Sequence, residues 1–298
     1  MTMLRTLTLI VLLSLAAIAR AEPVGSETLL KIARTRTINL GHRESSVPFS
    51  YYDARKQVVG YSHDLMLSVV ESVRKELRLP AITIRLIPIT SQNRIPLVQN
   101  GTIDLECGST THNRDRDRQA GFSVSIFQTS ARLLTRTTSG ISDISELKGQ
   151  PILVTAGTTS ERQLLMYQQS RSERFNMVSA ADHGEAFTLL QQGRAAAFLM
   201  DDAVLYGLRA KAEKPSDWTV VGQPMSTEVY ACMFRQGDTA FKAVVDRSLT
   251  GLMRSGDALK IYRKWFQSPI PPKGLTLNWA PPEHLLELYR NPSDAPLN

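Results

Sequence analysis

The alternation of short apolar segments with segments of helical spacing restricts the possible folds more than any other feature of this sequence. Apolar or β-branched runs predict strands at residues 36–42, 81–89, 103–107, 151–155, 177–179 and 195–200. Amphipathic spacing and helix-ending glycine or proline predict helices at residues 64–77, 92–101, 160–169 and 185–192. Because strands that alternate with helices form parallel sheets, the sequence predicts an α/β fold with largely parallel strands.

An internal repeat suggests that the chain contains two similar units. Residues 97–107 (LVQNGTIDLEC) and 189–199 (LLQQGRAAAFL) share one pattern at an offset of 92, in which a helix end, a Gln and a Gly precede a buried strand. Gly101 and Gly193 are expected to end their helices in the left-handed conformation. The pattern predicts two similar lobes, although helix–Gly–strand segments are also common in α/β proteins of other kinds.

The same offset relates polar residues that follow the predicted strands. It pairs Ser91 with His183 at strand-to-helix turns, and Ser109 with Asp201 beyond the carboxyl ends of strands. Open α/β sheets bind ligands at that edge. Two facing lobes would therefore present these residues across one cleft, which is the predicted binding site.

The residue types at this edge indicate the chemistry of the ligand. The other candidates there are Arg43, Arg94, Arg116, Thr111 and Thr159. Guanidinium groups pair with carboxylates, and the expected helix N-cap positions of Ser91 and Thr159 also favour an anion. Asp201 supplies the opposite charge that an ammonium group needs. A dicarboxylic amino acid fits this set better than a phosphate or a sugar.

Each candidate also has a purely structural interpretation. Arg116 lies in an alternating charge run at residues 114–118, and Arg94 could lie on an exposed helix face. Arg43 could form a surface salt bridge. His183 and Asp201 could simply belong to the starts of helices. Their common position at one sheet edge is what favours a binding site.

The first 21 residues are predicted to be a secretory signal peptide. Arg5 precedes an apolar run at residues 7–18, which is too short to span a membrane. Ala19 and Ala21 are small residues of the kind that signal peptidase recognises, so cleavage is expected before Glu22. The mature chain is therefore expected to be exported.

Charge and cysteine content argue against several other classes of protein. The formal net charge of +7 becomes +5 without the predicted signal peptide, and the basic residues are scattered, which disfavours nucleic acid as a partner. Cys107 and Cys232 form either a disulfide, which an exported protein permits, or two buried thiols. Without a CxxC, HExxH or P-loop motif, neither metal nor cofactor is expected, and any ATPase would be a separate protein.

Four segments closely resemble the solute-binding proteins of bacterial ABC importers for polar amino acids, in particular those for glutamate and aspartate. These segments are residues 41–53 (GHRESSVPFSYYD), 87–96 (IPITSQNRIP), 106–111 (ECGSTT) and 200–203 (MDDA). The resemblance extends from about Leu30 to the end of the chain. It implies a periplasmic, monomeric receptor without catalysis, which would deliver L-glutamate or L-aspartate to membrane permease subunits.

The resemblance also implies a two-lobed type II periplasmic-binding fold. Lobe one would comprise residues 27–130 and 230–298, and lobe two residues 131–229, with hinge strands near residues 130–135 and 227–230. It places Cys107 and Cys232 on adjacent strands of lobe one, where a disulfide would require suitable geometry.

The resemblance further implies three groups of ligand contacts. Arg116, Thr111 and Thr159 would hold the α-carboxylate, and Ser109 and Asp201 the α-ammonium. The side-chain carboxylate would contact Arg43, Ser91, Arg94 and His183. An uncharged ligand would leave two buried arginines unpaired, which is costly.

Two alternatives of other classes use the same fold. One is an accessory protein that presents its ligand to a sensor kinase or chemoreceptor. The other is a dehydratase-like enzyme, for which Glu44 and His183 are the available general acid–base candidates.

Overall fold

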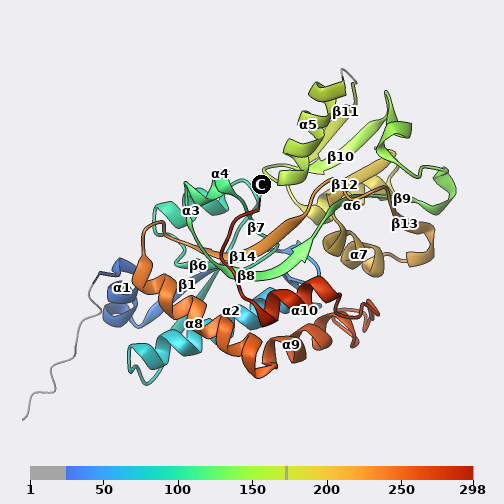
Figure 1. Ribbon diagram of the computed structural model, residues 1–298. Helices are drawn as coiled ribbons and strands as arrows, with labels where there is room; N and C mark the ends of the chain where they lie inside the picture. The colour runs from blue at the N-terminus through green and yellow to red at the C-terminus, as the bar shows by residue number, and fades with distance from the viewer. Residues whose placement is uncertain (1–24, 172–173, 298) are drawn as a thin grey trace, which may run out of the picture.

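The computed structural model describes residues 25–171 and 174–297, and these form two sheets that are each flanked by helices (Figure 1). The predicted signal peptide lies outside the described residues. Among the residues that are described, no helix is both long and apolar enough to cross a membrane.

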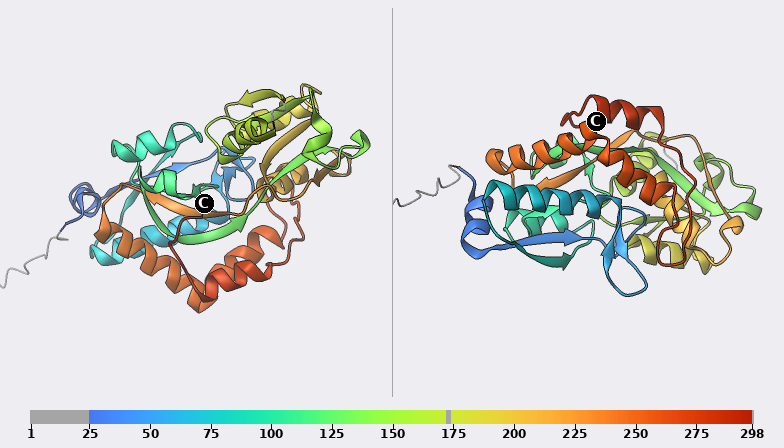
Figure 2. Two further views of the ribbon diagram at one scale, coloured as in Figure 1. Left: turned by 45° about the horizontal axis from the view of Figure 1, so that its top comes forward. Right: turned by 90° about the horizontal axis from the view of Figure 1, so that it is seen from below.

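The first sheet has six strands. Its order is β5 (Thr83–Pro88), β1 (Thr37–His42), β6 (Leu105–Glu106), β14 (Glu228–Phe234) and β7 (Thr111–His112), and β8 (Gly121–Thr129) also pairs with β14. The helices of this half are α1 (Glu27–Thr35), α2 (Tyr61–Glu76), α3 (Arg94–Gln99), α4 (Arg114–Asp117), α8 (Thr239–Ser255), α9 (Asp257–Phe266) and α10 (Glu283–Arg290). A small separate sheet comprises β2 (Ser45–Ser46), β3 (Ser50–Tyr52) and β4 (Val58–Val59). Helices α2, α8 and α9 pack beside one another along the first sheet (Figure 2).

The second sheet has five strands. Its order is β11 (Asn176–Ala180), β10 (Pro151–Thr155), β12 (Ala197–Asp201), β9 (Ala131–Arg136) and β13 (Trp218–Val221). It carries helices α5 (Thr159–Arg171), α6 (His183–Gln191) and α7 (Asp202–Lys211), with 3-10 turns η1 (Thr137–Ser139), η2 (Ile144–Leu147) and η3 (Pro215–Asp217). The chain enters this sheet at Ser130, between β8 and β9, and returns to the first sheet through residues 222–227.

The two sheets share one topology, which confirms the prediction of two similar units. In the first, the parallel strands β5, β1 and β6 are followed by antiparallel β14; in the second, the parallel strands β11, β10 and β12 are followed by antiparallel β9. Gly101 and Gly193 have φ angles of 75° and 73°, in the left-handed region, as expected for helix ends. The strand and helix alternation predicted the parallel part of each sheet; β8, β9, β13 and β14 make both sheets mixed.

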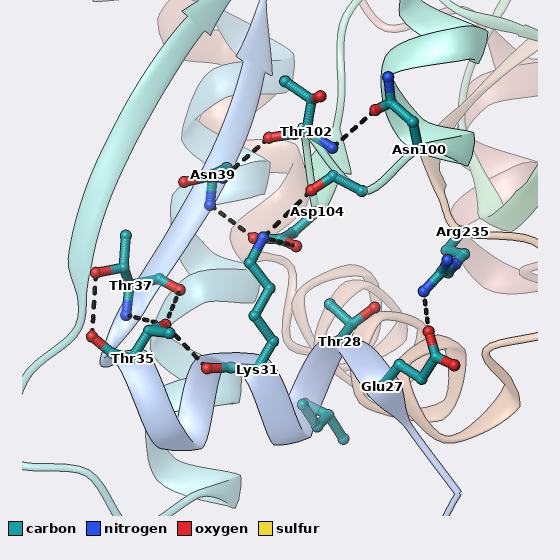
Figure 3. Close-up of polar contacts among 12 residues, drawn as sticks. Glu27, Thr28, Lys31, Thr35, Thr37, Asn39, Asn100, Thr102, Asp104 and Arg235 are labelled. Atoms are coloured by element: carbon teal, nitrogen blue, oxygen red, sulfur yellow. Dashed lines mark hydrogen bonds and ion pairs between the residues drawn. The ribbon is translucent and has the colours of Figure 1, made fainter.

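Partly buried polar contacts stabilise the end of the first sheet at which the parallel strands begin. The Asp104 carboxylate accepts hydrogen bonds from Lys31 Nζ at 2.8 Å and from the Asn39 backbone N–H at 2.9 Å (Figure 3). It therefore joins helix α1 to strand β1. This contact anchors the strand whose other end leads to Arg43.

Candidate functional site

The predicted binding residues meet between the two sheets, at the carboxyl ends of their parallel strands. Buried there are Arg43, Ser91, Arg94, Ser109, Thr111, Arg116, His183 and Asp201, and Thr159 is half-buried. Contacts across the two halves include Arg116 Nη2 to the Gly157 carbonyl at 3.3 Å. A polar cluster of this size, shielded from water, is typical of a site for a small charged ligand.

Two buried arginines form one end of this cluster. Arg43 is 1% exposed and Arg94 is 2% exposed. Arg43 Nη1 donates to Ser91 Oγ at 3.0 Å, while Nε and Nη2 of Arg43 and Nε of Arg94 have no hydrogen-bond partner within the described part of the chain. Burial lowers the pKa of Arg43 to about 10, so this side chain remains cationic at neutral pH, and burial also lowers the pKa of Arg94. Unpartnered donors of two cations in one buried place favour a carboxylate.

A buried carboxylate lies beside these arginines. Glu106 is fully buried, and it accepts a hydrogen bond from Thr110 Oγ1 at 2.7 Å; that hydroxyl also contacts Arg94 Nη1. Burial raises the pKa of Glu106, and the positive charge of Arg94 opposes that rise. A Cβ atom at Gly108 would lie 2.5 Å from Glu106 Oε1, so the glycine permits this packing.

His183 adds a neutral donor to the same end. Burial, followed by the charges of Arg43 and Arg94, lowers the pKa of His183 well below its usual value. Its Nδ1 lies 2.8 Å from Thr155 Oγ1, and its Nε2 has no partner within the described ranges. If the Thr155 hydroxyl donates to Nδ1, the ring hydrogen is on Nε2, where it can be donated to an anion.

Asp201 provides a buried carboxyl group in the same cluster. Tyr230 donates its hydroxyl hydrogen to Asp201 Oδ2, and the ring of Tyr230 packs against Phe49 at a centroid distance of 5.1 Å. Burial, together with the charge of Glu228, raises the pKa of Asp201 well above its usual value. The Asp201 carboxylate makes no capping bond to helix α7, which argues against a purely helix-capping role. Its oxygens can accept hydrogen bonds from an ammonium group, whose positive charge would in turn favour the ionised carboxylate.

The opposite side of the cluster joins the two sheets through Arg116 and two threonines. Arg116 Nη1 donates to the Thr111 carbonyl at 2.9 Å, and burial lowers the pKa of Arg116 to about 9. The hydroxyls of Thr111 and Thr159 lie 3.4 Å apart, and both contact the carboxylate of Glu228. Arg116 is only 8% exposed, so the alternating charge run around it does not make it a solvated residue.

Three sequence interpretations require correction. Ser91 is not a helix N-cap, because helix α3 begins at Arg94 with Asn93 at its N-cap position. Thr159 is not an N-cap either, because it is the first residue of helix α5, and the Glu161 N–H donates to Thr158 Oγ1 instead. Ser91 instead accepts the Arg43 hydrogen bond. The exposed-face interpretation of Arg94 is also wrong, because the first turn of α3 points this side chain into the buried cluster.

Ser109 lies close to this cluster through a different contact. Its hydroxyl donates to Ser46 Oγ at 3.3 Å, and its carbonyl lies 3.4 Å from Arg94 Nη1. Ser109 therefore lies beside the arginine end, within the region that the sequence predicted for it.

Further contacts close both rims of the cleft. On one rim, Ser45 hydrogen-bonds the Asp182 carboxylate, and the Gly184 N–H donates to Ser45 Oγ at 3.0 Å. On the other rim, Asp115 of α4 pairs with Arg162 of α5. These contacts join the two halves at the edges of the polar cluster.

The cysteine alternatives are resolved in favour of a disulfide. Cys107 and Cys232 are bonded, with their Cα atoms 4.3 Å apart. The bond links the loop after β6 to the neighbouring strand β14, and Cys107 itself lies between Glu106 and Gly108 in the sequence. No group of three or more potential metal ligands occurs among the described residues.

Several site residues were not singled out from the sequence. Glu106 and Thr110 lie inside the recognised ECGSTT segment, and their neighbours Ser109 and Thr111 were the available signal. Tyr230 and Glu228 lie just after the segment through which the chain returns to the first sheet. The sequence predicted only a hinge at this position. Their roles depend on the antiparallel strand β14, which spacing along the sequence does not reveal.

The fold and the buried site between two similar α/β units define a type II periplasmic-binding protein. The chain belongs to the bacterial extracellular solute-binding proteins, family 3, whose family model matches residues 38–268. This membership confirms the prediction of a solute-binding protein rather than an enzyme.

Solved structures with the same fold include a mutant of ArgBP from T. maritima, with a TM-score of 0.72 and 22% identity, covering 80% of this chain and 99% of that one. Another is an ABC uptake transporter substrate-binding protein from Streptococcus pneumoniae with bound histidine, with a TM-score of 0.72 and 23% identity, covering 82% and 97%.

Relatives of higher identity extend over nearly the whole chain. An L-glutamate/L-aspartate-binding protein of Pseudomonas aeruginosa is 53% identical over 283 residues, covering 94% of each chain. A glutamate/aspartate import solute-binding protein of Salmonella typhimurium is 49% identical over 288 residues, covering 95% of each.

Proposed function

We propose that this chain binds L-glutamate or L-aspartate in the cleft between its two lobes and delivers it to the membrane permease subunits of an ABC importer. The observation that carries this proposal is the pair of buried arginines, Arg43 and Arg94, whose unpartnered nitrogens lie beside neutral His183. Desolvated cations of this kind need an anion, which a dicarboxylic amino acid supplies through its side chain. The names of the relatives that extend over the whole chain support the same ligand class.

The proposed orientation of the ligand follows the charge distribution of the cleft. The side-chain carboxylate contacts Arg43, Arg94, Ser91 and His183, and the α-ammonium contacts Asp201 and Ser109. The α-carboxylate lies toward Arg116, Thr111 and Thr159. Helix α5 begins at Thr159, so its first backbone N–H groups add donors for that carboxylate.

Binding is proposed to stabilise a closed form of the protein. Lobe one is proposed to comprise residues 27–130 and 230–298, and lobe two residues 131–229, with rotation about the two crossings. A ligand that contacts both lobes favours closure, because it makes its full set of contacts only in the closed state. We further propose that the chain acts as a monomer in the periplasm after removal of residues 1–21.

Thermal unfolding of the mature chain tests this function, after refolding to remove any co-purified ligand. At 100 times its dissociation constant, a ligand adds about 2.7 kcal/mol to the free energy of unfolding. L-glutamate and L-aspartate are expected to raise the melting temperature, and L-glutamine is not. No shift with either acid would contradict the proposed ligand.

A further inference from the structure

A buried carboxylate that the proposed ligand contacts do not use lies beside the arginine end of the cleft, which Arg43 and Arg94 form. Glu106 is the last residue of β6 and has no exposed surface. Two glycines leave room for its side chain. A Cβ atom at Gly41 would lie 3.3 Å from Glu106 Cβ and Cγ, and one at Gly108 would lie 2.5 Å from Glu106 Oε1. The backbone around Glu106 is therefore built to hold a glutamate in this place.

The hydrogen bonds of Glu106 fit an ionised carboxylate. Thr110 Oγ1 contacts Arg94 Nη1 on one side and Glu106 Oε2, at 2.7 Å, on the other. Because a guanidinium group only donates, the hydroxyl accepts from Arg94 and gives its single hydrogen to Glu106. Glu106 Oε1 has no hydrogen-bond partner in the described part of the chain, so a proton there would be a buried donor without an acceptor. These contacts favour the charged form of Glu106.

Thr110 keeps this charge close to the arginines without letting it occupy them. Glu106 takes part in none of the ion pairs within residues 25–171 and 174–297, where Arg43 Nε and Nη2 and Arg94 Nε also have no partner. Burial lowers the pKa of Arg94, and Glu106 opposes this lowering more strongly than the other charged or titratable groups do. Glu106 therefore acts on the arginines through its charge and leaves their N–H groups to the ligand.

The buried charges at the arginine end add up to one positive charge. Arginine side chains stay protonated in proteins, so Arg43 and Arg94 contribute two positive charges, and Glu106 contributes one negative charge. The lowered pKa of His183 leaves its ring neutral. Asp182 also acts on Arg43, but it is only half-buried, at the rim. A single carboxylate therefore neutralises this end, whereas a group with two negative charges leaves an excess buried charge, which is costly.

We propose that Glu106 is a specificity-determining residue that limits the arginine end to one net positive charge and thereby selects ligands whose side-chain group is a monoanion. It does so as a counter-charge, with Thr110 between it and Arg94. The inference rests on the proposed function and deepens it, because it makes the charge of the ligand's acidic group, as well as its shape, a criterion for binding.

Two ligands of one shape and different charge test this assignment. L-cysteate carries a sulfonate with one negative charge, and L-2-amino-3-phosphonopropanoate carries a phosphonate that has two at about pH 8.5; both groups are tetrahedral. Calorimetric titration of the refolded mature chain is expected to show that L-cysteate binds at least about tenfold more tightly than the phosphonate. Tighter binding of the phosphonate by the wild type would overturn the inference.

The variant Glu106→Gln removes the charge and keeps an acceptor for Thr110. Electrostatic repulsion scales with the charge of the ligand. The variant should therefore bind L-cysteate and L-glutamate about tenfold more tightly, and the phosphonate about 100-fold more tightly, so that the preference for L-cysteate falls about tenfold. A merely structural role of Glu106 predicts weaker binding of all three ligands. That result, or an unchanged preference, would overturn the inference.

Two further variants separate charge from folding. Glu106→Asp keeps the charge and should keep the wild-type preference for L-cysteate. Glu213→Gln removes a charge at an exposed position after α7 and should leave all affinities unchanged. The preference is a ratio of two affinities in one sample, so an inactive fraction of the protein does not alter it. A Glu106→Asp chain with the preference of Glu106→Gln would overturn the inference.

Failure of the proposed function gives a different result from failure of this inference. A wild-type chain that binds none of these amino acids contradicts the proposed ligand class. Sulfate, a dianion without an ammonium group, then probes the two arginines directly, in chloride-free buffer of constant ionic strength. Glu106→Gln should bind sulfate at least about tenfold more tightly than the wild type. Equal sulfate affinities would overturn the inference.

Discussion

At the residue scale, the cleft depends on buried charges that the protein itself satisfies only in part. Within the described ranges, Arg43 and Arg94 each retain nitrogens without a hydrogen-bond partner. The neighbouring Glu106 likewise has no partner for its Oε1. Burial of these charged groups without partners lowers the stability of the protein, and a ligand of complementary charge offsets that cost when it binds. The proposed specificity for an acidic side chain follows from this imbalance.

Arg94→Ala is expected to weaken L-glutamate binding at least tenfold, because the ligand carboxylate loses a buried charge-assisted partner. Arg114→Ala is the matched control, since Arg114 lies two residues before Arg116 and is exposed. Titration calorimetry on both variants measures the effect. An Arg94→Ala affinity equal to that of Arg114→Ala would remove Arg94 from the site.

A buried histidine outside the cleft makes stability sensitive to acid. Burial lowers the pKa of His63 to about 4, and Asp64, His42 and Lys264 are the charged groups that also act on it. The unfolded chain takes up this proton near pH 6.5, so stability is lost as the pH falls from about 6.5 toward 4. Between pH 7.5 and pH 5, His63 should account for about 2 kcal/mol of lost stability.

Urea unfolding at both pH values measures this loss. His63→Gln should lose less stability on acidification than the wild type, and His284→Gln, at an exposed position, should match the wild type. Buried Asp201 and Glu106, with raised pKa values, act in the opposite direction in all three proteins. Equal losses in His63→Gln and wild type would contradict the prediction.

Sequence alone indicated most of the charged ligand-binding candidates, because strand ends in an α/β fold lie at one edge. It could not show that Arg116 is buried while Arg114 and Arg118, in the same charge run, are exposed. That difference comes from helix α4, which is a single turn with Asn113 as its N-cap. Glu228 was missed because its partners are 117 and 69 residues away.

At the scale of elements, the loop after β10 approaches the other half of the molecule very closely. Gly157 has a φ angle of 76°, and a Cβ atom there would lie 2.9 Å from both the N and Cα atoms of Gln92. Only glycine combines this backbone conformation with this approach. The contact brings the start of α5 to the cleft.

Gly157→Ala is therefore expected to impede closure and weaken L-glutamate binding more than tenfold. Gly149→Ala is a matched control, since its φ angle is 71° and nothing lies within 4 Å of the added Cβ. Both variants should lose about 1 kcal/mol of stability from backbone strain. If they bind L-glutamate equally well, the close approach is not part of closure.

The disulfide is a second element-scale constraint. It joins positions 125 residues apart and ties the segment with Glu106 and Gly108 to β14. The double variant Cys107→Ala/Cys232→Ala should lower the free energy of unfolding by about 2–5 kcal/mol, because the unfolded chain regains entropy. Denaturant unfolding measures this, and reduction of the wild type should give a similar loss. A change below 1 kcal/mol would contradict it.

The elements themselves were largely predictable. Periodicity located the parallel strands and their helices, and the repeat at residues 97–107 and 189–199 corresponds to equivalent strands, β6 and β12, of the two sheets. The long antiparallel strands β8 and β14 were not identified, since local periodicity does not reveal pairing between distant segments. These strands make the first sheet mixed and lead to the crossings.

At the scale of the whole molecule, two copies of one topology face each other across a polar cleft. The Ser45 contact with Asp182 and the pair of Asp115 with Arg162 join the halves at opposite rims. The Asp115–Arg162 pair is exposed and contributes little, and a ligand that contacts both halves is expected to add free energy that favours closure. Binding and closure are therefore expected to be strongly coupled.

The most direct measurement is a calorimetric comparison of L-glutamate, L-aspartate and L-glutamine on the refolded mature chain. Both acids are expected to bind with one molecule per chain, and L-glutamine at least about 100-fold more weakly, because its amide leaves the buried arginines Arg43 and Arg94 without an anion. L-glutamine binding as tight as that of L-glutamate, or no binding of either acid, would contradict an acidic amino-acid receptor.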